Sequence, residues 1–380
     1  MKLLFISEYF PRGKELRFSG GVEARTFYIA KYLAKKHEVH VVTSKLSDTK
    51  SNEKLFGINV HRVGPIRVYK PGAETSSIIA IINFTREAIK VGQNLKPDIV
   101  DGGNFISHTI AKEIGNKLKI PTVFWYPDVF LGNWVKTSGY IAGLGGWLNE
   151  KFNLLRGADM FIAISKVTRD KLIKNGVSSS KIRVIPCGVD KKEFVGTSHK
   201  YNETTIVCVS RLVGYKRIED LIWAFALLLK ENKGIQLVII GRGPTENKIN
   251  NIIKMLNIKK HVTIKLNLPR KELIETLKSS HLFCLPSEIE GFGISVVEAM
   301  AAKIPYVISN IPVFKEITHN GKGGSVFKLG DQQDLKSKLS KLLSNKSFYN
   351  SKIKESEGLL SIYNWEKIAS QTESVYKSLL

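Results

Sequence analysis

The sequence predicts an α/β protein of two domains, each built around a parallel β-sheet. Short apolar runs alternate with segments of helical spacing along almost the whole chain, which is typical of parallel strands joined by crossover helices. The chain has 380 residues, more than one ordinary core holds, and a polar stretch at 196–203 is expected as the hinge. We therefore expect an N-terminal domain over 1–195, a C-terminal domain over 204–360 and a final helical segment over 361–380.

Strands are expected where apolar residues alternate or run together between turn residues, and helices where apolar residues recur every three to four positions. The expected strands are 2–7, 39–43, 58–63, 97–100, 121–125, 158–165, 181–185, 206–210, 235–240, 262–266, 281–285 and 305–309. Helices are expected from 19–23 to about 36, at 76–94, 106–118 and 166–175, from 218, at 270–278, from 294, from 332 and at 364–380.

Charge and cysteine content indicate which partners and which cellular compartment to expect. The net charge is +24 and is spread over both halves, which indicates either a lysine-rich genome or contact with anionic lipid headgroups. No nucleic-acid-binding motif accompanies it, so no nucleic-acid partner is expected. No segment has transmembrane length, and residues 1–6 are too short for a signal-peptide core. Three distant cysteines fit neither a zinc site nor a disulfide framework, which favours the cytoplasm, at the inner face of the membrane if lipid is bound.

The stretch from 281 to 301 reads as a buried strand, a glycine loop and a helix. Gly291 and Gly293 place bare backbone N–H groups at the start of the helix, where anions bind. Glu290 lies in the loop and Glu298 about a turn into the helix, so both carboxylates can face one crevice and accept hydrogen bonds from hydroxyls. Hydroxyls at two places with phosphate between them describe a nucleotide sugar. The alternative is an ordinary helix start with one solvated glutamate.

Further anion-binding features follow other strands. Arg211 and Lys216 come between the strand at 206–210 and the next helix, where two bases form a cradle for phosphate unless they are simply solvated. Gly20 and Gly21 precede a helix in the first half, although such a pair is also a common turn. Gly241 lies in a Gly-x-Gly-Pro turn after the strand at 235–240, which is a weak signal by itself.

The motif Glu-Gly-Phe-Gly, followed by Glu-Ala-Met-Ala at 298–301, resembles glycosyltransferase family 4, the retaining enzymes of the GT-B fold. The order Ala-Ile-Ser-Lys, Asn-Gly-Val and Lys-Ile-x-Val-Ile-Pro-x-Gly-Val-Asp over 163–190 resembles the same family, and the similarity covers nearly the whole chain. The resemblance implies two Rossmann-like, doubly wound parallel-sheet domains that face a cleft. It also implies a C-terminal helix that crosses back to the first domain, with Trp365 suited to anchor it.

The family implies transfer of a sugar, of the hexose type, from a nucleotide-diphosphate sugar to an acceptor hydroxyl of a glycan or a lipid-linked sugar. In relatives, residues like Arg211 and Lys216 bind the diphosphate, and residues like Glu298 and Glu290 hold the ribose and the donor sugar. No metal ligand is expected, and no cofactor besides the donor substrate. The implied donor-binding residues are Gly20, Gly21, Arg211, Lys216, Gly241, Glu290, Gly291, Phe292, Gly293, Ile294 and Glu298.

Two segments depart from the family or leave alternatives open. Pro127 stands where many relatives carry a catalytic-site histidine, and the following Asp128 either orients or deprotonates the acceptor hydroxyl or caps the next turn. The apolar segment 130–148 carries Trp134, Tyr140 and Trp147. It is either a lid over the acceptor or part of the core, or else a surface that docks on a membrane interface.

Two rival functions share the predicted fold. One is a sugar-nucleotide 2-epimerase, which would release free nucleotide without any acceptor. The other is a non-catalytic nucleotide-sugar-binding protein. The spacing of Arg211 and Lys216 and the Glu-Gly-Phe-Gly motif match the transferases better, and the intact charged residues argue against a decayed site.

Overall fold

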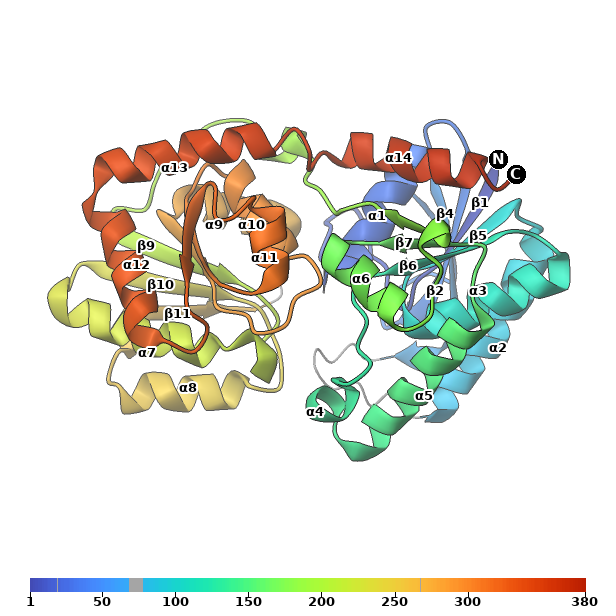
Figure 1. Cartoon of the computed structure of the whole chain (residues 1–380), viewed down its shortest axis with the longest axis horizontal. Helices are drawn as coiled ribbons and strands as arrows, with labels where there is room; N and C mark the ends of the chain where they lie inside the picture. The colour runs from blue at the N-terminus through green and yellow to red at the C-terminus, as the bar shows by residue number, and fades with distance from the viewer. Residues whose placement is uncertain (19, 68–77, 267) are drawn as a thin grey trace. The chain divides into compact units, whose positions relative to one another are not determined.

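The computed structural model describes residues 1–18, 20–67, 78–266 and 268–380 of the chain (Figure 1). It divides into two compact units. Unit 1 consists of Met1–Cys187 and Trp365–Leu380, and unit 2 consists of Gly188–Asn364. Each unit is an α/β fold around a mainly parallel sheet, as the sequence predicts. The predicted helix starts at Ser19 and Ser76 lie outside the described residues.

Unit 1 contains a sheet with the strand order β3-β4-β2-β1-β5-β6-β7-β8. Strands β2, β4 and β3 lie on one side of β1, and strands β5 to β8 lie on the other. The strand order therefore reverses between β1 and β5. This reversal is the feature that makes a sheet doubly wound. The strands are β1 (Lys2–Ile6), β2 (Glu38–Leu46), β3 (Asn52–Leu55), β4 (Ile58–Arg67), β5 (Ile99–Gly102), β6 (Thr122–Tyr126), β7 (Met160–Ala163) and β8 (Ile182–Val184).

The edge strand β3 corrects the expectation of a purely parallel sheet, because it pairs antiparallel with β4. Leu55 and Ile58 are directly paired, so Phe56 and Gly57 alone make the turn. Both have positive φ, 50° and 86°. Two left-handed residues in a two-residue loop match the twist of the flanking strands. The strand was not predicted because its residues are mostly polar, as is usual at a sheet edge.

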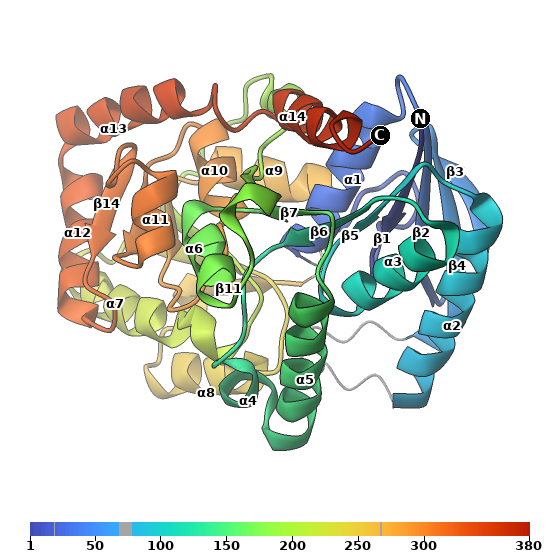
Figure 2. The same ribbon diagram turned by 45° about the vertical axis from the view of Figure 1, so that its right-hand side comes forward.

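Helices cover both faces of the unit 1 sheet (Figures 1 and 2). The core beneath α2 and α3 includes Leu4, Val100, Phe84 and Ile110. On the other face α1 packs against α14, and Trp365 stacks on Tyr28 with ring centroids 5.2 Å apart. The last helix therefore packs in unit 1, as the family resemblance implies. The helices are α1 (Gly21–Leu33), α2 (Ile78–Leu95), α3 (Phe105–Leu118), α4 (Trp134–Ser138), α5 (Tyr140–Arg156), α6 (Lys166–Lys174), the 3₁₀ turn η1 (Ser179–Lys181) and α14 (Trp365–Lys377).

Unit 2 contains a parallel sheet with the order β11-β10-β9-β12-β13-β14, which reverses between β9 and β12. Its strands are β9 (Thr204–Val209), β10 (Ile235–Ile240), β11 (Val262–Lys265), β12 (Leu282–Leu285), β13 (Tyr306–Ser309) and β14 (Gly324–Phe327). Its helices are α7 (Ile218–Glu231), α8 (Glu246–Met255), α9 (Arg270–Ser279), α10 (Ile294–Ala301), α11 (Pro312–Ile317), α12 (Gln332–Ser344) and α13 (Lys346–Leu359), with 3₁₀ turns η2 (Lys191–Phe194), η3 (Gly214–Lys216) and η4 (Lys259–His261). No helix in the described parts of either unit combines the length and the apolar character needed to cross a membrane.

The units separate at 187/188 and 364/365, whereas the sequence suggested 195 and 360 with a hinge at 196–203. Residues 188–203 belong to unit 2 because they form contacts with other parts of that unit. Val189 forms a β-bridge with Asn364, and the Tyr201 N–H donates to the Ser279 carbonyl oxygen at 2.9 Å. The polar composition of the stretch indicates exposure, but it does not reveal these partners.

Candidate functional site

The reversal of strand order in unit 2 brings two loops together. The loop after β9 carries Arg211 and Lys216, and the loop after β12, the neighbouring strand, carries Glu290. Ligands of open α/β sheets bind outside the carboxyl ends of the strands at such a reversal. Arg211, Lys216 and Glu290 therefore lie where a binding site is expected from topology.

Lys216 is a buried cation held by the β12 loop. Its ammonium forms an ion pair with Glu290 and donates to the Ile289 carbonyl oxygen at 3.4 Å. The Ser287 hydroxyl donates to the same Glu290 oxygen at 3.2 Å. Burial lowers the pKa of Lys216 below its ordinary value, Glu290 opposes that shift, and Arg211 adds to it. An anionic group bound beside Lys216 would add a second counter-charge and would also oppose the lowering of its pKa.

Tyr215 connects the two bases, and sequence reasoning did not single it out. The Arg211 guanidinium donates to the Tyr215 hydroxyl at 2.7 Å, and the ammonium of Lys216 lies 5.3 Å from the centre of the Tyr215 ring. The Tyr215 carbonyl oxygen accepts from the Glu288 N–H at 2.8 Å. Nothing in the local sequence distinguishes this tyrosine, because its role depends on what the next loop places beside it.

Gly293 in the β12 loop has a conformational reason to be glycine. Gly293 is the N-cap of α10 with φ 96°, a left-handed conformation that side chains rarely adopt. A Cβ there would lie 2.7 Å from Cε1 of Phe314. The neighbouring Phe292 is buried and packs edge-on against Tyr363, with centroids 5.6 Å apart. Of the predicted donor-binding set, Gly291 and Ile294 are half-buried beside them.

Gly241 is fixed by backbone packing. A Cβ on Gly241 would lie 1.7 Å from the Ser210 carbonyl oxygen, and one on Gly243 would lie 2.1 Å from that of Leu212. The Leu212 N–H also donates to the Arg242 carbonyl oxygen at 3.0 Å. These glycines therefore let the β10 loop hold the loop that carries Arg211. Gly241 thus helps to position the loop that carries Arg211, a role that the Gly-x-Gly-Pro motif alone does not reveal.

Glu298, the second predicted carboxylate, forms an ion pair with Arg270 at the start of α9. Arg270 also donates to Glu193 at 2.9 Å and lies over the ring of Phe194 at 5.8 Å. All three charged side chains are largely buried. Arg270 and Glu193 were missed because they are 28 and 105 positions from Glu298, and no spacing rule relates such residues.

The remaining predicted residues belong to unit 1. Gly20 is the N-cap of α1 in an extended conformation, a Cβ on it would meet nothing within 4 Å, and Gly21 begins the helix. Asp128 is buried after β6 and accepts from the Lys171 ammonium at 2.7 Å and from the Val129 N–H at 2.8 Å. Asp128 therefore has a contact with the adjacent backbone N–H and an ion pair with Lys171 that the sequence did not predict.

The aromatic segment is divided between the two predicted environments. Trp134 is buried, whereas Tyr140 and Trp147 are exposed. The Trp134 indole donates to the fully buried Glu150 at 2.6 Å, and Glu150 also accepts from the Phe130 N–H at 3.1 Å. Burial raises the pKa of Glu150 to about 7. This acid was missed because it stands in an otherwise apolar and glycine-rich run.

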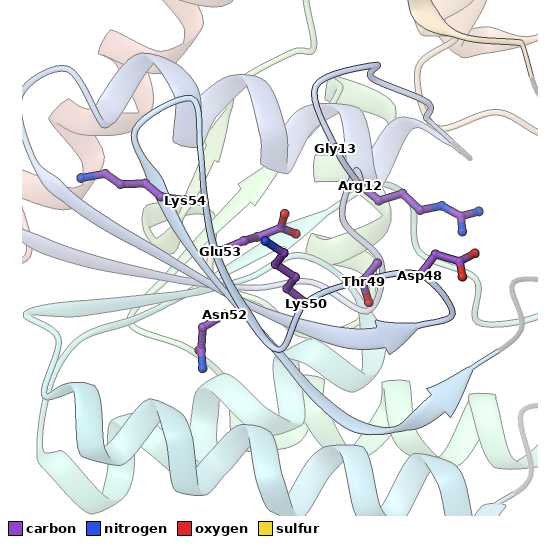
Figure 3. Close-up of a pocket in the computed structure, with 8 residues that line it drawn as sticks. All are labelled: Arg12, Gly13, Asp48, Thr49, Lys50, Asn52, Glu53 and Lys54. Atoms are coloured by element: carbon purple, nitrogen blue, oxygen red, sulfur yellow. The ribbon is translucent and has the colours of Figure 1, made fainter.

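Unit 1 also has a surface hollow of about 410 Å³ (Figure 3). It is lined by side chains of both charges and contains no predicted site residue, so we assign it no role. Its lining is Arg12, Gly13, Asp48, Thr49, Lys50, Asn52, Glu53 and Lys54. Within the described residues, no group of three or more His, Cys, Asp or Glu side chains is arranged to hold a metal ion.

Comparison with known proteins gives consistent matches. The family described as "Glycosyl transferases group 1" matches residues 189–358, and the one described as "Glycosyltransferase Family 4" matches residues 19–193. N-acetyl-alpha-D-glucosaminyl L-malate synthase of Bacillus anthracis is 26% identical over 370 residues, covering 93% of this chain and 92% of that protein.

Solved structures match the fold over the whole chain. Sucrose-phosphate synthase from Thermosynechococcus elongatus superposes with a TM-score of 0.84 at 18% identity, covering 100% of this chain and 98% of its own. The Anabaena protein HepE in complex with UDP-glucose superposes with a TM-score of 0.78 at 17% identity, covering 100% of both chains.

Proposed function

We propose that this chain, which belongs to the group 1, family 4-like glycosyltransferases of the GT-B fold, transfers a sugar from a nucleotide-diphosphate sugar to an acceptor hydroxyl with retention of the anomeric configuration. The observation that carries the proposal is the ion pair of Lys216 with Glu290 across the reversal between β9 and β12, with Arg211 beside it. The UDP-glucose complex of HepE, a protein of similar fold, supports a donor of this class.

The bases of the β9 loop would act on the leaving group. As the glycosidic bond breaks, negative charge develops on the diphosphate, and preorganised cations stabilise that charge most when they are already desolvated. Lys216 is buried and hydrogen-bonded before any donor arrives, so little reorganisation is needed. The N–H groups that begin α10 after Gly293 would add a further positive dipole. With these charges in place, we propose that the reaction needs no metal ion.

The two carboxylates would hold donor hydroxyls. We assign the donor sugar to Glu290 and the ribose to Glu298, following the family resemblance. Glu290 is anchored by Lys216 and Ser287, and Glu298 by Arg270. Because each carboxylate retains lone pairs beyond these contacts, it can accept hydroxyl hydrogen bonds without losing its orientation.

Unit 1 would contribute the acceptor side. We propose that Asp128 orients the acceptor hydroxyl, and that the Lys171 ammonium at 2.7 Å keeps its carboxylate in place. Gly20 and Gly21, at the start of α1, would offer backbone N–H groups to a phosphate. The acceptor would be a glycan or a lipid-linked sugar. The three described cysteines are buried free thiols, which fits action in the cytoplasm.

The test is a panel of nucleotide sugars. A donor should raise the melting temperature of the protein by mass action, whereas non-cognate donors should not. The stabilising donor is then incubated with candidate acceptors, and the anomeric configuration of the product is determined by NMR. Product formation with retention supports the proposal. Inversion would contradict the retaining mechanism, free nucleotide with a rearranged sugar would indicate an epimerase, and binding without turnover would indicate a non-catalytic protein.

A further inference from the structure

The inward face of helix α5 consists mainly of small and polar residues, with Leu154 as its buried apolar member. A Cβ on Gly146 would lie 2.4 Å from Cε3 of Trp134, and one on Gly143 would lie 2.7 Å from the Cα of Val135. These two glycines let α5 pack directly on α4. The helix therefore cannot rotate to turn larger side chains inward without breaking this contact.

Two polar side chains hold the same face. Glu150 and Asn153 are both fully buried. Glu150 accepts from Trp134, while the Asn153 amide donates to the Phe105 carbonyl oxygen at 2.9 Å and accepts from Thr109 at 3.1 Å. A surface helix usually buries apolar residues and exposes polar ones. In α5 most of the large apolar residues are exposed instead, Leu154 excepted, and specific hydrogen bonds hold the buried polar residues.

The outward face of α5 is a row of large apolar side chains, which we call the apolar stripe. Its members recur at helical spacing, and their exposed fractions run from 52% to 88%. Trp147, 40% exposed, borders them. Both ribbon views place α5 on the side of unit 1 away from α14 (Figures 1 and 2). The apolar stripe consists of Tyr140, Ile141, Leu144, Leu148, Phe152 and Leu155.

The charges that accompany the apolar stripe are positive. Across α4 and α5 the ionisable side chains other than tyrosine are Lys136, Glu150, Lys151 and Arg156, and the only acid among them is the buried Glu150. Arg156 pairs with Glu113 of α3 at 2.7 Å. The solvent-facing charge of these helices is therefore basic, and the whole chain carries +24. An apolar row with basic flanks is complementary to a surface of acyl chains below anionic headgroups.

We propose that α5 docks unit 1 on a bilayer that contains anionic lipid. The helix would lie in the plane of the interface, because its 17 residues span only about 25 Å and it is not long or apolar enough to cross. The apolar stripe would enter the boundary between headgroups and acyl chains, with Tyr140 and Trp147 at headgroup depth and Lys136 and Lys151 near the phosphates. A second copy of the chain fits less well, because it would bring like charges together.

The experiment uses the full chain and vesicles of phosphatidylcholine with or without phosphatidylglycerol, in the absence of any donor. The stripe variant is Ile141→Gln with Leu148→Gln and Leu155→Gln. Its matched control is Ile173→Gln with Met255→Gln and Leu380→Gln, three exposed apolar residues at scattered positions outside α4 and α5. A charge variant is Lys136→Gln with Lys151→Gln. Far-ultraviolet circular dichroism and melting temperature establish that each variant is folded.

We expect co-sedimentation with anionic vesicles that weakens as salt rises. The stripe variant should lose at least about tenfold in affinity and the charge variant roughly fivefold per lysine, while the control binds like the native chain. Native-like binding by the stripe variant, or failure of the native chain to bind either vesicle at low salt, overturns the proposal. So does a lipid-free dimer that the stripe substitutions dissociate, since the stripe would then belong to a second copy. None of these outcomes depends on sugar transfer.

Discussion

Lys216 and Glu290 form a largely buried ion pair although 74 positions separate them in the chain. Each follows a different strand, and only the adjacency of β9 and β12 brings them together. Removing one partner would leave the other buried without its counter-charge. Substitution of either residue is therefore expected to weaken both the stability of the loop and the binding of a diphosphate.

Arg211→Ala or Lys216→Ala should lower turnover at least about a hundredfold, because each removes a preorganised charge stabiliser. Initial rates with the donor found by the thermal-shift panel measure the effect. Lys248→Ala is the control, since Lys248 is an exposed base paired with Glu219 elsewhere in unit 2. Near-native turnover in a folded variant at either site would remove that residue from the mechanism.

Turnover should be unchanged by EDTA. The proposed charge stabilisers are Arg211, Lys216 and the start of α10, and none of them is a metal ligand. The measurement compares rates before chelation, after it, and after re-addition of magnesium or manganese. A rate that collapses with chelator and recovers with either ion would show that the reaction requires a metal.

Gly293→Ala should reduce both stability and donor affinity. The new Cβ would combine an unfavourable φ of 96° with a 2.7 Å contact to Phe314, and we expect a loss of about 1–3 kcal/mol in unfolding free energy. Gly358→Ala is the control, because a Cβ there meets nothing within 4 Å and alanine favours the helix. Urea titration and donor thermal shift are the measurements. Equal stability of the two variants would show that the loop relaxes around the added methyl group.

Arg25→Met should destabilise the protein by about 3–5 kcal/mol, because it leaves Asp101 buried without its counter-ion. Arg25 donates two hydrogen bonds of 2.8 Å to Asp101, which also accepts from Tyr376 of α14. Lys35→Met breaks the exposed Lys35–Glu366 contact and should cost well under 1 kcal/mol. Chemical denaturation followed by circular dichroism distinguishes the two. Comparable small losses would mean that water or rearrangement compensates the buried carboxylate.

Glu150 should make stability depend on pH. Burial raises its pKa from 4.5 to about 7, so the folded state holds a proton that the unfolded chain releases at lower pH. The bound proton contributes on the order of 3 kcal/mol to the free energy of unfolding. This contribution is fully present below about pH 4.5 and is lost as the pH rises through about 7. Glu150→Gln should remove that part of the decline, whereas Glu113→Gln, at an exposed site, should not. Unfolding free energies at pH 5 and pH 8 decide this, and identical pH slopes for native chain and Glu150→Gln would contradict it.

The sequence by itself was sufficient for features that depend on neighbouring residues. The succession of strand, loop and helix around Arg211, and again around Gly293, follows from apolar spacing and from the backbone freedom of glycine. Alternation of these units along the chain predicts two parallel-sheet domains, and the family motifs predict which loops face a donor. In the described structure Lys216 forms an ion pair with Glu290, and Arg211 is near enough to lower the pKa of Lys216.

Only the tertiary structure decided which distant side chains meet. Arg270 pairs with Glu298, Glu150 is buried against Trp134, and Tyr140 is exposed to solvent. The antiparallel strand β3 and the unit boundary at 187/188 also depend on pairing rather than on pattern. The physical reason is that local sterics act over a few residues, whereas burial and charge pairing depend on which surfaces the whole packed chain brings into contact.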